Sequence, residues 1–334
     1  MLSAERLQAR RAGIGGSDIG AILGKNKYRT PLDVYLEKTG EKDPDDLSGN
    51  AAVEWGIRLE DVIAEKFADD TGLKVRRNNR LLVGDEPFML ANIDRGIAGK
   101  PEGVKAGLEC KTSDPYAFRA DEWGPGAEFY GRGDALEVVQ DDDRVPDSYL
   151  FQCVWYMAIT GADLWFLSVL VGGRDFRTYT IRRDDELIDI VKRVAGIFWR
   201  EKVLARVPPA PQTQADIETL YAMDNGKAVE ASPELLHTWA RVKELQTQIK
   251  ALETELNGTK IGRTYVGGLK DQLRKAIGEH SELLLSTEGK PLATWKQSKS
   301  SKVFDLEKFK KDHPKLHREY QVERPGPRVL LIKG

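Results

Sequence analysis

A cluster of prolines at 207–214, VPPAPQTQ, divides this chain and limits what each part can form. Proline fixes the backbone angle φ and has no N–H to donate, so such a cluster stops a helix and stiffens a linker. About 200 residues of mixed helical and strand patterns precede it, and a helical stretch with a short β-rich tail follows it. A length of 334 residues also suits two domains. We therefore expect a first domain over 1–207, a linker over 208–231 and a C-terminal extension over 232–334.

Helical and strand patterns alternate in the first segment. Ser17-Asp18 predicts the start of a short helix, and Thr30-Pro31 predicts the start of another that ends at Gly40. Apolar residues at helical spacing predict a longer helix over about 51–71. The remaining expected elements are strands at 74–84, 88–98, 106–113, 163–172 and 175–182, an irregular stretch at 114–146, and helices at 147–160 and 184–206. This order predicts an α/β (α+β) fold with a mixed central sheet flanked by helices.

Seven apolar residues of the second segment have coiled-coil spacing. They predict a seam of about three heptads and are Leu235, Trp239, Val242, Leu245, Ile249, Leu252 and Leu256. A second helix at about 266–280 would be able to fold back on the first as an antiparallel hairpin. Residues 283–297 predict a strand, a turn at Glu288-Gly289 and a second strand, and residues 327–334 predict a last strand.

The charge balance limits how this chain binds its partners. Its 51 Lys and Arg residues nearly balance its 53 Asp and Glu residues, for a net charge of −2, which excludes nucleic-acid binding by bulk positive charge. The last segment, 286–334, departs from this balance with 12 basic and 6 acidic residues. Its aromatic residues lie among lysines, a composition that suits single-stranded DNA, and a solvated basic face is the alternative.

Several absences set the expected location of the chain. It has no run of about 18 apolar residues that would span a membrane, and its N-terminus has no apolar signal core. Cys110 and Cys153 are its only cysteines, too few for a disulfide framework or a four-cysteine metal site. We therefore expect a cytoplasmic protein, in a bacterial host, with no membrane contact.

Two carboxylates and a lysine form the most informative pattern. Asp94 ends one predicted strand, and Glu109 and Lys111 lie two apart on the next, so both of their side chains point to one face. Two carboxylates, a backbone carbonyl and waters suit Mg²⁺, which prefers oxygen ligands in octahedral geometry. A neighbouring lysine would orient or deprotonate water, or stabilise negative charge near a phosphate. The pattern fits phosphodiester hydrolysis, and the alternative is a surface strand with alternating charges.

Polar residues on two predicted helices accompany this pattern. Glu60 lies close to the apolar stripe of the helix at 51–71, where it is either a further metal ligand or a solvated glutamate. Gln152 and Tyr156 lie four apart and therefore share one face of an otherwise apolar helix. Their alternative role is a satisfied core glutamine with a packed tyrosine.

The order of these residues resembles the PD-(D/E)XK nuclease superfamily. Asp94, Glu109-x-Lys111 and Gln152-x-x-x-Tyr156 follow one another after a helix that carries Glu60. The chain is most similar to the phage-type alkaline exonucleases, namely lambda exonuclease and the YqaJ-like viral recombinase family. The resemblance implies a restriction-endonuclease-like core for the predicted α/β domain.

Two longer motifs extend the resemblance. RRAGIGGSDIGAILG at 10–24 resembles the opening motif of that family, and VPDSYLFQCVWYMAITG at 145–161 also fits it. The Pro-Asp pair of the superfamily is reduced here to Ile93-Asp94, which leaves the acid in place. The similar region covers residues 5–207.

The resemblance implies roles for the site residues. The ligands of Mg²⁺, with Mn²⁺ as a substitute, would be Asp94, Glu109, the backbone carbonyl of Cys110 and, at a second metal position, Glu60. Lys111 would act on the attacking water. Gln152 would help to position Lys111, that water or the nearby DNA backbone.

The resemblance also implies an activity and an assembly. Such enzymes are homotrimeric rings that degrade one strand of duplex DNA from its 5′ end and leave a 3′ single-stranded overhang. The overhang serves phage-type homologous recombination by single-strand annealing. The expected partners are therefore duplex ends with a 5′-phosphate, further copies of the chain and a single-strand annealing protein.

The start of the chain is expected to bind the DNA end. By the same resemblance, Arg10 or Arg11 would bind the 5′-phosphate together with Ser17, and Tyr156 would contact the DNA. Gly15-Gly16-Ser17 at the start of a helix would also expose backbone N–H groups to an anion, and adjacent arginines favour bidentate phosphate contacts. The alternative is an ordinary helix cap.

Two other functions are weighed against this one. A PD-(D/E)XK endonuclease, or a repair nuclease of other polarity, would use the same residues, although a nuclease with a four-cysteine iron–sulfur cluster is disfavoured by the two cysteines. A non-catalytic DNA-binding scaffold is disfavoured because the acids and Lys111 are all present.

Overall fold

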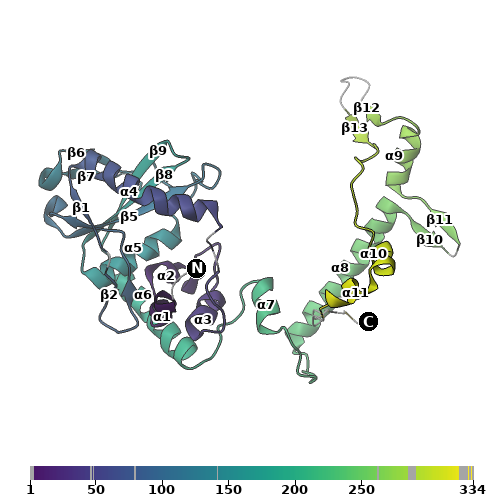
Figure 1. Cartoon of the computed structure of the whole chain (residues 1–334), viewed down its shortest axis with the longest axis horizontal. Helices are drawn as coiled ribbons and strands as arrows, with labels where there is room; N and C mark the ends of the chain where they lie inside the picture. Colours follow the sequence, from purple (N-terminus) through teal and green to yellow (C-terminus); the bar gives the residue numbers. More distant parts are fainter. Residues whose placement is uncertain are drawn as a thin grey trace. The chain divides into compact units, whose positions relative to one another are not determined.

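The computed structural model describes residues 4–45, 47, 49–78, 80–140, 142–261, 263–284, 291–322, 330 and 332. They form two compact units, Met1–Leu220 and Tyr221–Gly334 (Figure 1). Among these described residues, no helix is both long and apolar enough to cross a membrane.

A five-stranded sheet forms the centre of the first unit. Its order is β1-β4-β5-β8-β9, in which β5 and β8 run parallel and the other neighbouring strands run antiparallel. The strands are β1 (Lys74–Arg77), β4 (Arg95–Ala98), β5 (Ala106–Ser113), β8 (Leu164–Val171) and β9 (Asp175–Arg182). The sheet is therefore mixed, which confirms the predicted α/β fold class.

The sequences of the two central strands explain their positions. Strand β8 reads LWFLSVLV and is almost wholly buried, as expected for a strand covered on both faces. Strand β5 is buried from Ala106 to Cys110 and becomes half-buried and polar from Lys111 onward. Because parallel strands need a long crossover, helix α5 (Asp147–Thr160) lies in the connection between them.

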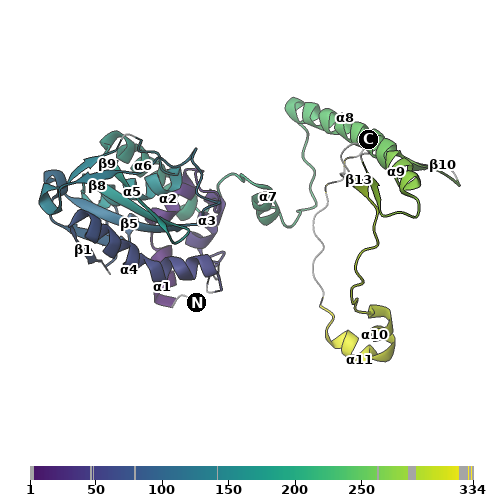
Figure 2. The same ribbon diagram turned by 90° about the horizontal axis from the view of Figure 1, so that it is seen from above.

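Helices cover both faces of this sheet. Helix α4 (Ala51–Thr71) packs on one face through a cluster that contains Ile63 and Phe67. Helices α2, α5 and α6 contribute to a second cluster on the other face, and Figure 2 shows α4 and α6 on opposite sides. The other helices of this unit are α1 (Ala4–Arg11), α2 (Gly16–Ile22), α3 (Pro31–Thr39), α6 (Asp185–Ile197) and α7 (Gln214–Leu220).

Capping residues set the ends of two helices as the sequence predicts. Helix α3 begins after Thr30, whose side chain accepts the N–H of Asp33, and it ends at Gly40 with φ of 78°. Helix α4 begins after Asn50 and ends at Gly72 with φ of 71°, a left-handed conformation that favours glycine. The predicted helix over 51–71 is therefore confirmed.

Other local expectations need correction. Helix α2 begins after Gly15, one residue before Ser17-Asp18, because Asp18 caps the helix from inside by accepting the Gly15 N–H at 2.9 Å. The strands predicted over 74–84 and 88–98 are each divided, since β2 (Leu82–Val83) and β3 (Leu90–Ala91) form a separate pair. The elements not predicted include η1 (Pro101–Gly103), β6 (Glu128–Tyr130), η2 (Gly133–Ala135), β7 (Glu137–Val139) and α7, which lies in the predicted linker. The helix predicted over 184–206 is α6 continued by the π-helical η3 (Phe198–Leu204).

The second unit contains the predicted long helix, α8 (Pro233–Asn257), on which the seam residues are exposed or half-buried within their own unit. Helix α9 (Leu269–Ile277) contacts α8. Strands β12 (Glu282–Leu284) and β13 (Pro291–Thr294) form the predicted antiparallel pair. The turn at Glu288-Gly289 and most of the strand predicted over 327–334 lie outside the described residues. The unit's further elements are β10 (Thr259–Ile261), β11 (Thr264–Val266), α10 (Leu306–Asp312) and α11 (Pro314–Glu319).

Candidate active site

Strand β5 sorts its side chains onto the two faces of the sheet. Leu108 and Cys110 belong to the hydrophobic cluster beneath α4. Because side chains alternate along a strand, Glu109 and Lys111 face the other side, where they meet helix α5. The spacing of two residues thus brings the predicted glutamate and lysine together.

The Glu109 carboxylate is the centre of this cluster and is 2% exposed. Its Oε1 accepts an N–H of Gln152 at 2.6 Å and lies 2.5 Å from Lys111 Nζ. Its Oε2 is buried and has no hydrogen-bond partner among the described residues when both acids are ionised, since a hydrogen bond to Asp94 needs a proton on one of the two carboxyl groups. Leaving a buried carboxylate oxygen without a partner costs free energy, so this oxygen lies where a ligand would be favourable.

Helix α5 positions both neighbours of Glu109. Gln152 Nε2 also donates to the Tyr156 hydroxyl at 2.8 Å. Tyr156 is 4% exposed and packs against Gly16, where an added Cβ would lie 2.5 Å from the ring. The Lys111 ammonium lies over the Tyr149 ring, 5.2 Å from its centroid, a favourable cation–π contact. Tyr156 therefore holds Gln152 from the interior of the domain.

Asp94 lies at the edge of β5, directly before β4 begins. Its Oδ2 accepts the backbone N–H of Cys110 at 2.9 Å. The N–H and C=O of one residue point to the same side of a strand, so the Cys110 carbonyl faces this edge as well. Asp94 and Glu109 also lie close enough to influence each other's ionisation. The three oxygen ligands expected from the sequence, namely the carboxylates of Asp94 and Glu109 and the Cys110 carbonyl, are therefore neighbours.

The electrostatics of the cluster differ from those of a solvated surface. Burial raises the pKa of Glu109 to about 8, against the attraction of Lys111, and the charge of Asp94 adds to the rise. Burial also raises the pKa of Asp94, again against Lys111. Burial alone would lower the pKa of Lys111, but Glu109 and Asp94 outweigh it and raise that pKa. Strongly shifted carboxylates beside a lysine are typical of functional sites.

Glu60 lies near this cluster on the α4 side of the sheet, and its charge raises the pKa of Asp94. Its Oε1 accepts an N–H of Arg95 at 2.6 Å. Arg95 also pairs with Asp61. The structure thus places the expected second-metal glutamate in an ion pair that the sequence analysis did not foresee.

The fit of the site to a divalent cation follows from these donors. Asp94, Glu109 and the Cys110 carbonyl supply hard oxygen ligands of the kind that Mg²⁺ prefers. Among the described residues, no three His, Cys, Asp or Glu side chains form a group that could hold a metal ion. The third expected carboxylate, Glu60, is engaged by Arg95. The fit therefore rests on the two carboxylates and above all on the partnerless Glu109 Oε2.

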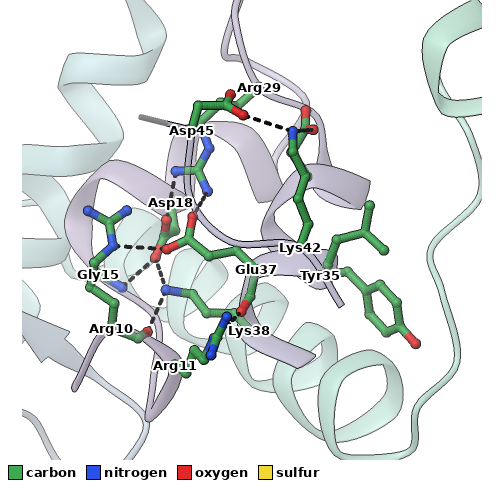
Figure 3. A network of polar contacts seen from close by, with 12 residues as sticks. Arg10, Arg11, Gly15, Asp18, Arg29, Tyr35, Glu37, Lys38, Lys42 and Asp45 are labelled. Atoms are coloured by element: carbon green, nitrogen blue, oxygen red, sulfur yellow. Dashed lines mark hydrogen bonds and ion pairs between the residues drawn. The ribbon is translucent and has the colours of Figure 1, made fainter. Parts of the chain in front are cut away.

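The arginines expected to bind phosphate belong to a separate cluster of charges, drawn in Figure 3. Arg10 Nε donates to Glu37 Oε1 at 2.9 Å. Arg11 Nη2 lies 2.5 Å from Asp43 Oδ1, and its Nε donates to the Glu37 carbonyl at 3.3 Å. Ser17 is exposed at the start of α2. Both arginines therefore already have carboxylate partners in this structure.

Asp18 is buried at the centre of this second cluster (Figure 3). Its Oδ1 lies 2.9 Å from Arg29 Nη1 and its Oδ2 lies 2.7 Å from Lys38 Nζ. Arg29 reaches Glu37 Oε2 at 2.8 Å, and Lys38 also donates to the Arg10 carbonyl at 2.8 Å. Burial favours a raised pKa for Asp18, but Lys38 and Arg29 reverse this and lower it.

Sequence reasoning missed several residues of both clusters. Arg95 directly follows Asp94, and Tyr149 lies three residues before Gln152 on the same helical face, so short spacing was a usable signal for each. Lys38 and Glu37 gave no such signal, because the partners Asp18 and Arg10 lie about 20 to 30 residues away on other helices and Arg29 lies in the loop before α3.

The chain is similar to several known proteins. The sequence profile of the YqaJ-like viral recombinase domain matches residues 5–163. An uncharacterized protein, YqaJ of Bacillus subtilis (strain 168), is 33% identical over 334 aligned residues, which cover 96% of this chain and 91% of the relative. Among solved structures, an alkaline exonuclease from Laribacter hongkongensis is 15% identical with a TM-score of 0.44, over 61% of this chain and 94% of its own. A phage related exonuclease from Haemophilus somnus 129PT is 14% identical with a TM-score of 0.38, over 60% of this chain and 99% of its own.

Proposed function

Because the chain belongs to the YqaJ-like viral recombinase family, we propose that it is a Mg²⁺-dependent exonuclease that degrades one strand of linear duplex DNA from its 5′ end. One observation carries the proposal. Glu109, buried beside Asp94 and Lys111, keeps a carboxylate oxygen without a partner among the described residues. A cluster held at this energetic cost is better explained by a ligand than by stability.

The chemistry of the proposed site divides among its residues. Asp94, Glu109 and the Cys110 carbonyl would hold Mg²⁺, or Mn²⁺ in its place. A bound divalent cation makes a water more acidic and offsets charge on the leaving oxygen. Lys111, confined between Glu109 and the Tyr149 ring, would orient the attacking water or stabilise the charge of the phosphate.

The remaining contacts keep the site in shape. Gln152 donates to one oxygen of Glu109, which leaves the other directed to a ligand. Tyr156 holds the Gln152 amide through its hydroxyl. Glu60 would lie beside a second metal position, with one of its oxygens held by Arg95.

The 5′-phosphate would bind near the start of α2, with Ser17 and one of the two arginines. For this, Arg10 or Arg11 would exchange a carboxylate partner for phosphate. Arg11 is the better candidate because Asp43 is highly exposed, and exposed ion pairs are weak. Glu37, the partner of Arg10, is in contrast buried, although the Arg10 side chain itself is partly exposed.

Family membership also supports a proposed assembly and setting. A homotrimeric ring would enclose the duplex, so that the net charge of −2 is compatible with sustained DNA contact. The 3′ overhangs would be passed to a single-strand annealing protein during recombination. Light scattering tests the assembly, since a monomer mass would contradict the ring.

Three substrates test the proposed activity. The full chain is incubated with a linear duplex bearing 5′-phosphates, the same duplex with 5′-hydroxyls, and a covalently closed circle, each with Mg²⁺ or with EDTA. We expect Mg²⁺-dependent release of 5′-mononucleotides from the phosphorylated linear duplex, and an intact circle. Cleavage of the circle would instead support the endonuclease alternative. Equal rates on the 5′-phosphate duplex and the 5′-hydroxyl duplex would contradict the proposed binding of the 5′-phosphate by Arg11 and Ser17.

A further inference from the structure

Arg95 is a buried cation at the edge of the candidate active site. It is the first residue of β4 and is 3% exposed. Its register partner on β5 is Leu108, whose side chain faces α4. The Arg95 side chain therefore reaches towards α4, on the face of the sheet opposite Glu109 and Lys111.

The Arg95 guanidinium joins this helix to the strand edge that carries Asp94. Its Nη1 donates to Glu60 Oε1 at 2.6 Å and to the Asp94 backbone carbonyl at 2.7 Å. Its Nη2 pairs with Asp61, one residue further along α4. The planar guanidinium thus fixes the position of Glu60, a predicted metal ligand on α4, relative to Asp94, the predicted ligand directly before β4.

The nearby carboxylates explain why a guanidinium is buried at this position. Glu60, Asp61, Asp94 and Glu109 bring four carboxylates. Arg95 and Lys111 bring two cations, and Arg77 brings a third at 3.6 Å from Asp61. With every group ionised, the site carries one unbalanced negative charge, which a divalent cation would offset. Burying a guanidinium costs free energy unless its donors are satisfied, and here three oxygens satisfy them.

We propose that Arg95 is a positioning residue that sets Glu60 and Asp94 for a divalent cation, an inference that rests on the proposed metal-dependent function. Arg95 acts through its fork of donors rather than through its charge alone. Lysine keeps the charge but has no fork that spans two acceptors. The substitution Arg95→Lys therefore separates positioning from electrostatics.

The test measures Mn²⁺ binding to the full chain without DNA, by the loss of the electron paramagnetic resonance signal of free Mn²⁺. We expect Arg95→Lys to weaken Mn²⁺ binding by about tenfold, as for other residues that orient metal ligands. Arg182→Lys is the matched control, because it alters an exposed arginine–carboxylate pair on the same sheet, at 2.8 Å from Glu102. Arg182→Lys is expected to bind Mn²⁺ like the wild type.

A double-mutant cycle keeps the proposal testable if Arg95→Lys lowers the melting temperature. Glu60→Gln keeps an oxygen that accepts from Arg95 and removes the carboxylate charge. If Arg95 works through Glu60, then adding Arg95→Lys to Glu60→Gln weakens Mn²⁺ binding less than it does in the wild type. Full additivity, or wild-type binding by folded Arg95→Lys, would overturn the positioning role alone. No Mn²⁺ binding by the wild type would overturn the proposed metal-dependent function and this role with it.

Discussion

Two buried clusters of charge in the first unit look alike in composition and differ in how well their charges are satisfied. The Glu109 cluster leaves Oε2 without a partner among the described residues. In the Asp18 cluster (Figure 3), both oxygens of Asp18 and both of Glu37 have a cationic partner. Burial raises the pKa of Glu109 to about 8, whereas Lys38 and Arg29 outweigh burial and lower the pKa of Asp18.

This difference separates two uses of buried charge. A fully paired cluster joins its elements, here α1, α2 and α3, and its Asp18 carboxyl favours the ionised state. In an incompletely paired cluster, burial opposes ionisation of the carboxyl group, and a bound cation would favour its charged form. We therefore expect changes in the first cluster to affect catalysis and changes in the second to affect stability.

The largest expected effect is on catalysis. Lys111→Ala should lower the rate of DNA cleavage by about 1,000-fold or more, within the range for removal of a group that acts on the reacting atoms. Gel assays on a linear duplex measure the rate, and a thermal melt reports the fold. Lys192→Ala, which loses an exposed pair with Asp85, is the matched lysine control and should cleave normally. Normal cleavage by Lys111→Ala would contradict the proposed catalytic role of Lys111.

The next effect is on stability. Asp18→Asn should lower the free energy of unfolding by about 3–5 kcal/mol, because it leaves the buried Lys38 without its carboxylate and removes one of the two carboxylate partners of Arg29. Urea unfolding at neutral pH measures the change. A loss below about 1 kcal/mol would mean that the Asp18 cluster does not hold these helices together.

The pH dependence of that loss has a definite sign. The pKa of Asp18 is lower in the folded chain than its ordinary value of 3.8, so the folded state binds fewer protons there than the unfolded state does. The stabilisation is therefore fully present above pH 3.8 and disappears as the pH falls through the folded pKa. The difference between wild type and Asp18→Asn should shrink over this acidic range and stay constant above it.

A smaller effect tests Tyr156, for which the sequence predicts contact with DNA. Tyr156→Phe removes the hydroxyl that accepts from Gln152, a change of about 1 kcal/mol for a single hydrogen bond. We expect kcat to fall about fivefold with KM for DNA unchanged, because the buried ring positions Gln152. A rise in KM with unchanged kcat would restore the DNA-binding role.

How much of this could be predicted from the sequence depends on the range of each contact. The two-residue spacing of Glu109 and Lys111 and the four-residue spacing of Gln152 and Tyr156 fix shared faces, and the structure joins these two pairs. The mixed sheet and the helix over 51–71 also follow from local patterns.

Contacts between distant elements could not be predicted in this way. The pairing of Arg10 with Glu37 spans 27 residues and that of Arg95 with Glu60 spans 35, so no periodic pattern connects them. The same limit explains the division of the strands predicted over 74–84 and 88–98. The end of the first and the start of the second form the short pair of β2 with β3, and tertiary packing decides this pairing.

The central claim is that the incompletely paired carboxylate serves catalysis, and Glu109→Gln tests it most directly. The amide keeps the size of the side chain and an oxygen to accept from Gln152, but it removes the charge that would hold a divalent cation. The measurement is Mg²⁺-dependent nucleotide release from a 5′-phosphorylated linear duplex, at equal concentrations of folded wild type and variant. The account predicts release by the wild type and none above background by Glu109→Gln. Release at the wild-type rate by the variant would contradict it.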